Sequence, residues 1–256
     1  MGSSRLPGKN GRLLAGRPML ARLIDRLKAS TAIDVICLAT TTEPEDDRLV
    51  AFARAEGIEV HRGSTSDVMG RVLGAAESVD ADVVVEITGD CPLSDPGIID
   101  AVVHRYARGG FDYVANILDV LTFPAGFDVQ VFSRELLSDA AGLTADPQDR
   151  EDVTRFFYRN PARYRLLNLR APVELDRPQY WLCVDYPEDF ALVAALYEEL
   201  LPISPLFSAR QIIDHLDRHP ALAASNTARD GLFSCPHSDG SAVHETLTLA
   251  AVEGTL

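Results

Sequence analysis

Short apolar, β-branched runs alternate along this chain with longer stretches whose apolar positions recur at helical spacing. The runs predict strands at residues 34–39, 58–62, 82–88, 112–117, 127–133, 165–170 and 181–185. The longer stretches predict helices at residues 46–56, 67–79, 97–108, 134–141, 148–159, 187–200 and 208–218. Such alternation is typical of a layered α/β fold with a mostly parallel sheet.

A further helix is predicted ahead of the first of these strands. Pro18 suits the first turn of a helix, and Met19, Leu23 and Leu27 fall on one apolar stripe. A chain of 256 residues suits one large domain, which we assign to residues 1–220. Beyond that point Ala, Ser, Thr and Gly dominate, so residues 221–256 are predicted to form a partly mobile tail that adds little to the core.

The charge of the chain restricts its partners. A formal net charge of −14 argues against binding to a nucleic-acid backbone. Residues 1–30 are the exception, because they hold seven Lys and Arg residues and one Asp, which suits a small anion such as a nucleoside triphosphate. No apolar run approaches the roughly 20 residues of a membrane span. No secretory signal follows Met1, so we expect a cytoplasmic protein with no membrane partner.

The cysteines and histidines suggest no covalent or zinc chemistry. Cys37, Cys91, Cys183 and Cys235 lack metal-ligand spacing, and we expect free thiols rather than a disulfide. No Ser/His/Asp or Cys/His catalytic arrangement can be recognised in the sequence, which argues against a covalent hydrolase.

The first nine residues are a candidate phosphate-binding loop. Gly2, Ser3 and Ser4 would present backbone N–H groups, while Arg5 and Lys9 would offset the charge of a triphosphate. The loop matches neither the Walker spacing nor a GxGxxG fingerprint. Composition alone also fits a flexible basic tail.

Two acidic residues occupy positions that suit a metal site. Asp90, in ITGDCP, follows the apolar run 82–88, and Asp185, in VDYPED, ends the run 181–185. Open α/β sheets bind ligands at the carboxyl ends of their strands. Mg²⁺ takes one or two protein carboxylates together with phosphate oxygens and water. Asp90 and Asp185 are therefore predicted magnesium ligands, with a turn-capping role as the alternative for Asp90.

Several motifs occur in the order found in one enzyme family. They are MGSSRLPGK with AGRPML, then ATTTEPEDD, HRGSTSDVMGR, ITGDCPLSDP, FPAGFDVQVFS and VDYPEDF, and they span about residues 1–220. In these motifs the chain resembles the CMP-sugar synthetases, which include CMP-KDO synthetase and acylneuraminate cytidylyltransferase. It is most similar to the spore-coat polysaccharide cytidylyltransferases. The resemblance implies a three-layer fold like that of the nucleotide-diphospho-sugar (GT-A) transferases.

The resemblance also assigns roles to residues. It supports Asp90 and Asp185 as metal ligands. For the nucleotide it implies contacts from Arg62, Gly63, Asp67 and Thr88, although Asp67 equally fits a helix cap. For the acceptor it implies contacts from Gly126, Asp128, Gln130, Arg150 and Glu151.

Three positions depart from the spore-coat-type pattern. Glu86, Gln130 and Asp152 stand where arginine, glutamate and histidine are usual. Thr88 stands where KDO enzymes have glutamine. The first three departures bear on the identity of the acceptor more than on the reaction.

These features predict a cytidylyltransferase that moves CMP from CTP to a sugar-type acceptor, such as a keto-acid sugar, in surface polysaccharide or related biosynthesis. Mg²⁺ is the expected cofactor, Arg5, Lys9, Asp90 and Asp185 the expected catalytic residues, and CTP and the acceptor the expected partners. A homodimer is an option. The alternatives are a GT-A-type glycosyltransferase, whose usual DxD element is absent at Asp90, and a nucleotide-binding protein with a degenerate site.

A phosphate loop of this kind ordinarily follows a strand, and no strand is predicted ahead of it here. In the resembling enzymes an apolar first strand and an arginine precede the methionine that corresponds to Met1. We therefore expect the reading frame to begin upstream, and the 256-residue chain to be poorly soluble or to bind CTP weakly.

Overall fold

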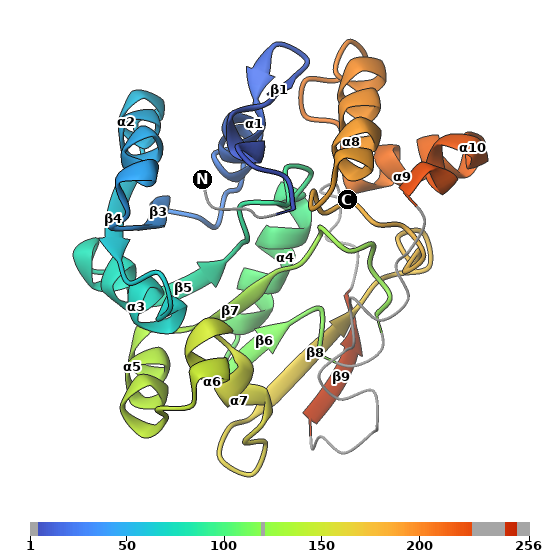
Figure 1. Ribbon diagram of the computed structural model, residues 1–256. Helices are drawn as coiled ribbons and strands as arrows, with labels where there is room; N and C mark the ends of the chain where they lie inside the picture. Colours follow the sequence, from blue (N-terminus) through green and yellow to red (C-terminus); the bar gives the residue numbers. More distant parts are fainter. Residues whose placement is uncertain (1–4, 119–120, 227–243, 250–256) are drawn as a thin grey trace.

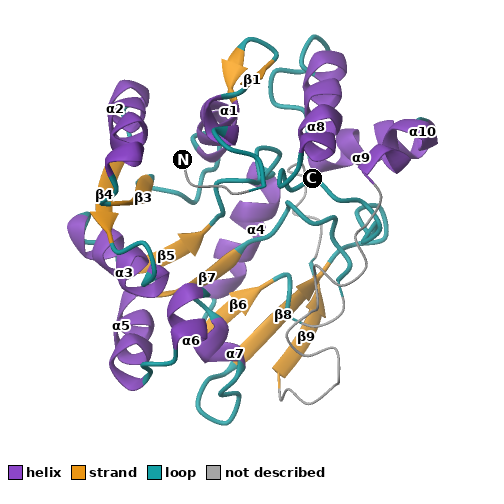
Figure 2. Ribbon diagram, in the orientation of Figure 1, coloured by secondary structure: helices purple, strands orange, loops and turns teal. Residues whose placement is uncertain are grey.

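The computed structural model describes residues 5–118, 121–226 and 244–249 (Figures 1 and 2). Its strands are β1 (Leu13–Leu14), β2 (Arg17–Pro18), β3 (Cys37–Thr41), β4 (Glu59–Gly63), β5 (Val83–Glu86), β6 (Tyr113–Ala115), β7 (Gln130–Ser133), β8 (Leu166–Arg170) and β9 (His244–Thr248). Its α-helices are α1 (Met19–Leu27), α2 (Asp47–Glu56), α3 (Val68–Ser78), α4 (Pro96–Ala107), α5 (Arg134–Leu143), α6 (Pro147–Glu151), α7 (Arg155–Tyr158), α8 (Pro187–Leu200), α9 (Ala209–Arg218) and α10 (Pro220–Ala223).

The largest sheet has the strand order β5-β7-β6-β8-β9. Strand β7 runs antiparallel to both of its neighbours, whereas β6, β8 and β9 run parallel to one another. The predicted α/β architecture is confirmed, with the correction that this sheet is mixed rather than mostly parallel. The reversal at β7 matters for the site, because it brings the segment 124–129 back to the edge where β5 ends.

Strands β3 and β4 form a separate parallel pair. Within the described residues, no strand lies between β3 and β5 and no ladder joins them. The sheet is therefore divided at this place.

Helices cover both faces of the largest sheet, which gives three layers. On β6, the side chain of Val114 packs in the core cluster built around α1, α4, α8 and α9. Its neighbours Tyr113 and Ala115 pack in the second cluster, with residues of α3, α5 and α7. Successive side chains of a strand point to opposite faces, so these two clusters are the two interfaces of a layered fold.

Two predicted elements are wrong in detail. Residues 181–185 form no strand: Trp181 makes one isolated bridge with Ala125, and the Leu182 N–H donates to the Ala125 carbonyl at 2.8 Å. This extended segment pairs with loops instead of a sheet neighbour. The single helix predicted at 148–159 is broken into α6 and α7, because the backbone of Asp152 is extended and its carboxylate accepts from the Thr154 N–H.

The segment 221–256 contributes more than predicted. Strand β9 extends the sheet by pairing with β8, and Leu249 joins the core. The buried Asn226 donates to Asp189 Oδ1 at 3.1 Å. Residues 227–243 and 250–256, the remainder of the predicted tail, lie outside the described residues.

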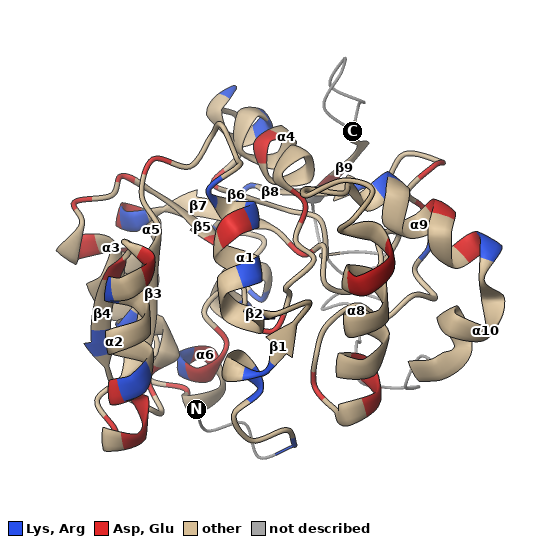
Figure 3. Cartoon of the chain, turned by 90° about the horizontal axis from the view of Figure 1, so that it is seen from above, with Lys and Arg blue, Asp and Glu red and all other residues tan. Residues whose placement is uncertain are grey.

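Acidic and basic residues alternate over α2 and α9, whereas α8 carries acidic residues and no Lys or Arg (Figure 3). In the part of the chain that the structure describes, no helix combines the length and the apolar character needed to cross a membrane.

Candidate active site

The two predicted metal ligands lie side by side at the end of β5. Asp90 is in the loop after β5, and Asp185 comes just before α8. The Val184 N–H donates to the Asp90 carbonyl oxygen at 2.8 Å, which ties the two segments together. Lys9 bridges their side chains, since its Nζ lies 3.2 Å from Asp90 Oδ2 and 3.7 Å from Asp185 Oδ1. Residues far apart in the sequence thus converge on one point.

Both predicted phosphate-binding cations reach this carboxylate pair. The Lys9 side chain is only 11% exposed, and its ammonium also donates to the Val184 carbonyl at 2.6 Å. The Arg5 guanidinium lies 3.6 Å from Asp185 Oδ2. Gly2, Ser3 and Ser4, the remainder of the predicted loop, lie outside the described residues.

The start of α8 holds Asp185 in place. The carboxylate of Asp189 accepts hydrogen bonds from the backbone N–H groups of Asp185 at 3.0 Å and of Tyr186 at 2.8 Å. Pro187 occupies the first turn, where a missing N–H does no harm. Asp189 is therefore an acid in the first turn of α8, where the helix dipole favours a negative charge, and it orients the backbone of the neighbouring metal-ligand candidate.

The electrostatics favour an ionised Asp90. Burial by itself raises the pKa of this carboxyl, but the Lys9 ammonium and the hydrogen bonds from Lys9 and Thr88 outweigh it, so the net pKa is lowered. Two carboxylates that already share a cation are a donor set that suits Mg²⁺. The residues present therefore fit the predicted ion.

A third acid lies near the pair. Burial raises the pKa of Asp128 to about 7, with a further contribution from the charge of Asp90 and an opposing hydrogen bond from the Gly126 backbone. Its carboxylate lies beside the thiols of Cys91 and Cys183, whose sulfurs are 3.5 Å apart. Cys37, Cys91 and Cys183 are free, as predicted. Cys235 lies outside the described residues.

Gly126 permits the close approach that places Asp128. Its φ of +106° is one that side chains rarely adopt, and an added Cβ would lie 2.8 Å from the Leu182 carbonyl carbon. The predicted acceptor residue Gly126 thus has a steric role in holding the segment 124–129 against the segment that leads to Asp185.

Most of the other cations near the amino terminus serve the fold. Arg17 pairs with Asp25 at 2.6 Å, and the buried Arg26 donates to the Ser94 carbonyl at 2.6 Å. The prediction of a broad anion patch over residues 1–30 therefore needs correction. Among the described residues, the cations that reach the carboxylate pair are Arg5 and Lys9.

The predicted nucleotide contacts form a second group around β4 and α3. Asp67 caps α3, since its carboxylate accepts a hydrogen bond from the Gly70 N–H at 2.8 Å, and this confirms the helix-cap alternative. Its carboxylate also lies 3.4 Å from the guanidinium of Arg150, a predicted acceptor residue. The Arg62 guanidinium is occupied by the Thr41 carbonyl at 2.8 Å and by Asp47 at 2.7 Å.

Two further predicted nucleotide residues have close neighbours. A Cβ added at Gly63 would lie 2.9 Å from the Arg71 side chain. The Thr88 hydroxyl lies 3.2 Å from the sulfur of Cys91, which is the residue that follows Asp90. Of the predicted nucleotide residues outside the opening loop, Thr88 is the one in contact with the carboxylate site.

The three departures from the spore-coat-type pattern are neighbours in space. Gln130 donates to Glu86 Oε2 at 3.3 Å and accepts from the Thr154 hydroxyl at 2.7 Å. Burial raises the pKa of Glu86 to about 8, and the charge of Asp152 adds to this effect. The predicted acceptor residue Glu151 is exposed on α6.

The comparison with known families decides the family of this chain. The family model described as Cytidylyltransferase matches residues 1–211. The chain belongs to the cytidylyltransferase family. It is therefore a nucleotidyltransferase by family, and CTP is its expected nucleotide substrate.

Individual relatives agree with this family. The chain is 34% identical over 233 residues to the spore coat polysaccharide biosynthesis protein SpsF of Bacillus subtilis, covering 89% of this chain and 95% of that protein. A solved cytidylyltransferase of Leptospira borgpetersenii is 30% identical with a TM-score of 0.81, over 90% of this chain and 95% of that one. CMP:2-keto-3-deoxy-manno-octonic acid synthetase complexed with CTP shares the fold, at 17% identity and a TM-score of 0.58, over 77% and 95% of the two chains.

The sequence did not single out Arg71 of this cytidylyltransferase. Its Nε is buried and has no hydrogen-bond partner among the described residues. Arg71 lines a cavity of about 380 Å³ together with Thr88 and Gly89, the residue before Asp90. Its place as the last residue of HRGSTSDVMGR was a usable signal, because motif residues with charged side chains are candidates for ligand contact.

Replacing Glu86 with glutamine is expected to change how stability depends on pH. Glu86 has a raised pKa in the folded protein, so the folded state keeps a proton that the unfolded state has already lost. The free energy of unfolding should therefore fall as pH rises from about 4.5 to about 8, by at most about 1.4 kcal/mol per pH unit from this group.

Urea denaturation at several pH values between 5 and 8 checks this prediction. E86Q should lack this part of the slope, and E151Q, at an exposed position, should keep it. An E86Q variant with an unchanged slope would show that Glu86 ionises normally.

Proposed function

We propose that this protein transfers CMP from CTP to a hydroxyl of a sugar-type acceptor and releases pyrophosphate. This proposal rests on one observation. The carboxylates of Asp90 and Asp185 both lie within ion-pair distance of the ammonium of Lys9, the last residue of the predicted phosphate-binding loop. The family and the relatives named above supply the choice of CTP.

Asp90 and Asp185 would hold Mg²⁺, which would supply a positive charge that polarises the phosphoryl oxygens. Lys9 and Arg5, which already lie at these carboxylates, would offset the charge that develops on the leaving pyrophosphate. The acceptor oxygen forms a bond to the α-phosphorus in line with the breaking bond between that phosphorus and the oxygen that bridges it to the β-phosphorus. Pyrophosphate leaves with this oxygen and the electron pair of the broken bond, and the proton of the acceptor hydroxyl passes to solvent. No protein nucleophile is required, so catalysis consists of positioning and charge stabilisation.

The acceptor side of the site argues for a neutral or amino sugar over a keto-acid sugar. Asp128 lies two residues ahead of Gln130, the first residue of β7, and Glu86 lies opposite Gln130. A carboxylate on the acceptor would meet the negative charge of Asp152, whereas hydroxyl or ammonium groups would find hydrogen-bond acceptors in Asp152 and Gln130. We therefore rank uncharged and amino sugars ahead of keto-acid sugars.

A pyrophosphate-release assay tests the proposal. The protein is incubated with CTP, Mg²⁺ and a panel of neutral sugars, amino sugars, sugar phosphates, keto-acid sugars and phosphonates, and products are identified by mass spectrometry. The expected result is pyrophosphate release that requires one acceptor, with a product heavier by CMP. Sugar transfer from a nucleotide sugar would instead support the glycosyltransferase alternative. Nucleotide binding without turnover across the panel would support the degenerate site.

A further inference from the structure

Two buried thiols and a carboxylate lie together next to the magnesium-ligand candidate Asp90. The sulfurs of Cys91 and Cys183 are 3.5 Å apart, and one carboxylate oxygen of Asp128 lies within 4.8 Å of both. Cys91 is 1% exposed, Cys183 is 6% exposed and Asp128 is half-buried. Among the described residues, this is the one group of at least three Cys, His, Asp or Glu side chains whose ligand atoms come this close together. The reaction proposed above uses neither thiol.

The backbone on both sides of Cys183 holds this group in place. The residue before Cys183 donates its N–H to the Ala125 carbonyl at 2.8 Å, which joins this segment to the one that carries Asp128. The residue after it donates its N–H to the Asp90 carbonyl at 2.8 Å, which joins it to the loop of Cys91. Because 92 positions separate the two cysteines in the sequence, local metal-ligand spacing gives no sign of the group.

The spacing of the sulfurs suits a tetrahedral metal ion. Two Zn–S bonds of about 2.3 Å at the tetrahedral angle place the sulfurs about 3.8 Å apart. The observed separation of 3.5 Å between Cys91 and Cys183 is close to this value. Two thiolates and a carboxylate, with water as the fourth ligand, favour Zn²⁺ over Mg²⁺, because Mg²⁺ takes oxygen ligands in octahedral geometry.

Neighbouring groups orient two of these ligands. The Gly126 backbone donates a hydrogen bond to the Asp128 carboxylate. The Thr88 hydroxyl lies 3.2 Å from the Cys91 sulfur. Groups that hydrogen-bond to metal ligands fix their direction and strengthen metal binding. The thiol group therefore has the supporting contacts of a metal site.

A metal ion at the thiols would act on the neighbouring carboxylate pair. Asp90 Oδ1 lies 3.7 Å from the Cys91 sulfur, while Asp90 Oδ2 contacts Lys9. Cys183 is two residues ahead of Asp185 in the sequence. An ion bound to the thiols would therefore compete for an oxygen of Asp90, and its charge would repel a second cation at the pair.

We propose that Cys91, Cys183 and Asp128 form a zinc-binding site, and that Zn²⁺ bound there inhibits the protein by weakening the binding of Mg²⁺ at Asp90. Each thiol releases its proton to solvent as its sulfur binds the ion, so no oxidant or reductant takes part. The zinc site rests on ligand geometry alone. The effect on Mg²⁺ rests on the function proposed above.

Metal titrations of the full chain, in the presence of a phosphine reductant, test the zinc site. All forms are free of a histidine tag and carry Cys235→Ser, which leaves Cys37, Cys91 and Cys183 as the thiols. Calorimetry measures the affinity for Zn²⁺ in excess Mg²⁺. Co²⁺ in place of Zn²⁺ reports thiolate ligands through its charge-transfer absorption. Thermal melts without metal establish that each variant folds.

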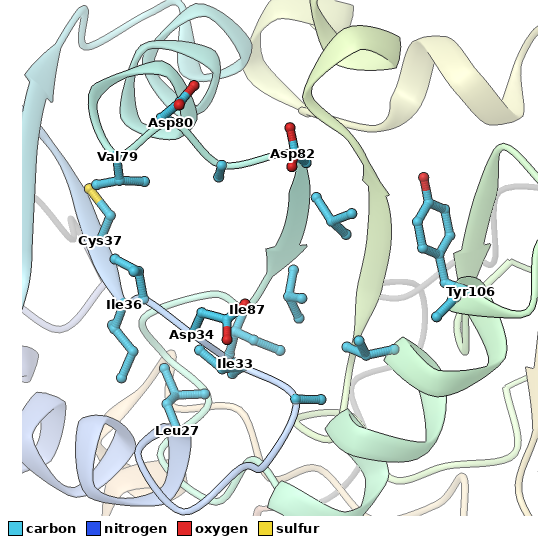
Figure 4. Close-up of a pocket in the computed structure, with 17 residues that line it drawn as sticks. Leu27, Ile33, Asp34, Ile36, Cys37, Val79, Asp80, Asp82, Ile87 and Tyr106 are labelled. Carbon is cyan, nitrogen blue, oxygen red and sulfur yellow. The ribbon is translucent and has the colours of Figure 1, made fainter.

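Cys91→Ser and Cys183→Ser should each weaken Zn²⁺ binding at least about a hundredfold and lower the Co²⁺ absorption, because each removes a direct ligand. Asp128→Asn should weaken Zn²⁺ binding as well, and it tests the site if a serine variant fails to fold. Cys37→Ser is the matched control and should change neither measurement. Figure 4 shows Cys37 beside Val79, in a pocket that neither Cys91 nor Cys183 lines.

Titration with Mg²⁺, with and without Zn²⁺, tests the inhibition, and pyrophosphate release is measured alongside. One equivalent of Zn²⁺ should weaken Mg²⁺ binding at least tenfold and lower turnover in the wild type, and Cys183→Ser should remove both effects. Wild-type Zn²⁺ affinity in both serine variants would overturn the zinc site. Zn²⁺ binding at the thiols that leaves Mg²⁺ affinity and turnover unchanged would overturn the inhibition. A zinc-free wild type that binds no Mg²⁺ would instead contradict the proposed function.

Discussion

Replacing Asp90 or Asp185 with asparagine should lower turnover at least about a hundredfold. Each change removes one charged oxygen ligand and keeps the shape of the side chain. The two carboxylates lie at the site surface, with 29% and 17% of their side chains exposed, so neither supports the core. Both variants should need more Mg²⁺ for half-maximal activity.

Steady-state rates with CTP over a range of Mg²⁺ concentrations measure this effect, and thermal melts establish that the variants fold. Asp214→Asn is a suitable control, because this exposed carboxylate pairs with Arg210 within α9 and with no predicted site residue. If D90N or D185N retained close to full activity, that aspartate would have no place in the metal site.

Replacing Lys9 with alanine should lower turnover as strongly as the aspartate variants do. It should strengthen the binding of Mg²⁺, which the aspartate variants weaken. Lys9 is the cation between the two carboxylates, so its removal leaves two negative charges without their shared partner. We expect tighter binding of Mg²⁺ to the free protein, weaker binding of CTP, and a loss in turnover of about a hundredfold or more.

Calorimetric titration with Mg²⁺ alone and with CTP separates these effects. Lys28→Ala is the matched control, since Lys28 donates to the Glu56 carbonyl on the exposed surface. If K9A bound Mg²⁺ more weakly than the wild type, or kept wild-type turnover, Lys9 would not be the cation that offsets the charge of the two carboxylates and of the leaving pyrophosphate.

The sequence predicts well those elements whose pattern is local. The stripe that contains Leu23 and Leu27 became α1, and the segment that opens with Pro187 became α8 with the predicted bounds 187–200. The pairing of Asp90 with Asp185 was also predictable, because both follow apolar runs and the family motifs place both at the site.

The other features of the fold and of the site depend on contacts between distant parts of the chain, which a local sequence pattern does not predict. The run 181–185 is as apolar as a strand, but Leu182 and Val184 pair with loops at Ala125 and Asp90. Residues 244–248 have an ordinary polar composition, and they become β9 only because β8 offers a free edge. The contact of Gln130 with Glu86 likewise arises from the register of β5 with β7.

Calorimetric binding of CTP and UTP in the presence and absence of Mg²⁺ tests the central claim most directly, and it needs no acceptor. It should be made on the 256-residue chain. We expect CTP to bind at least tenfold more tightly than UTP, which corresponds to about 1.4 kcal/mol, and we expect Asp90→Asn to abolish the dependence on Mg²⁺. Equal affinity for UTP, or CTP binding that is indifferent to Mg²⁺ and to Asp90, would contradict the account.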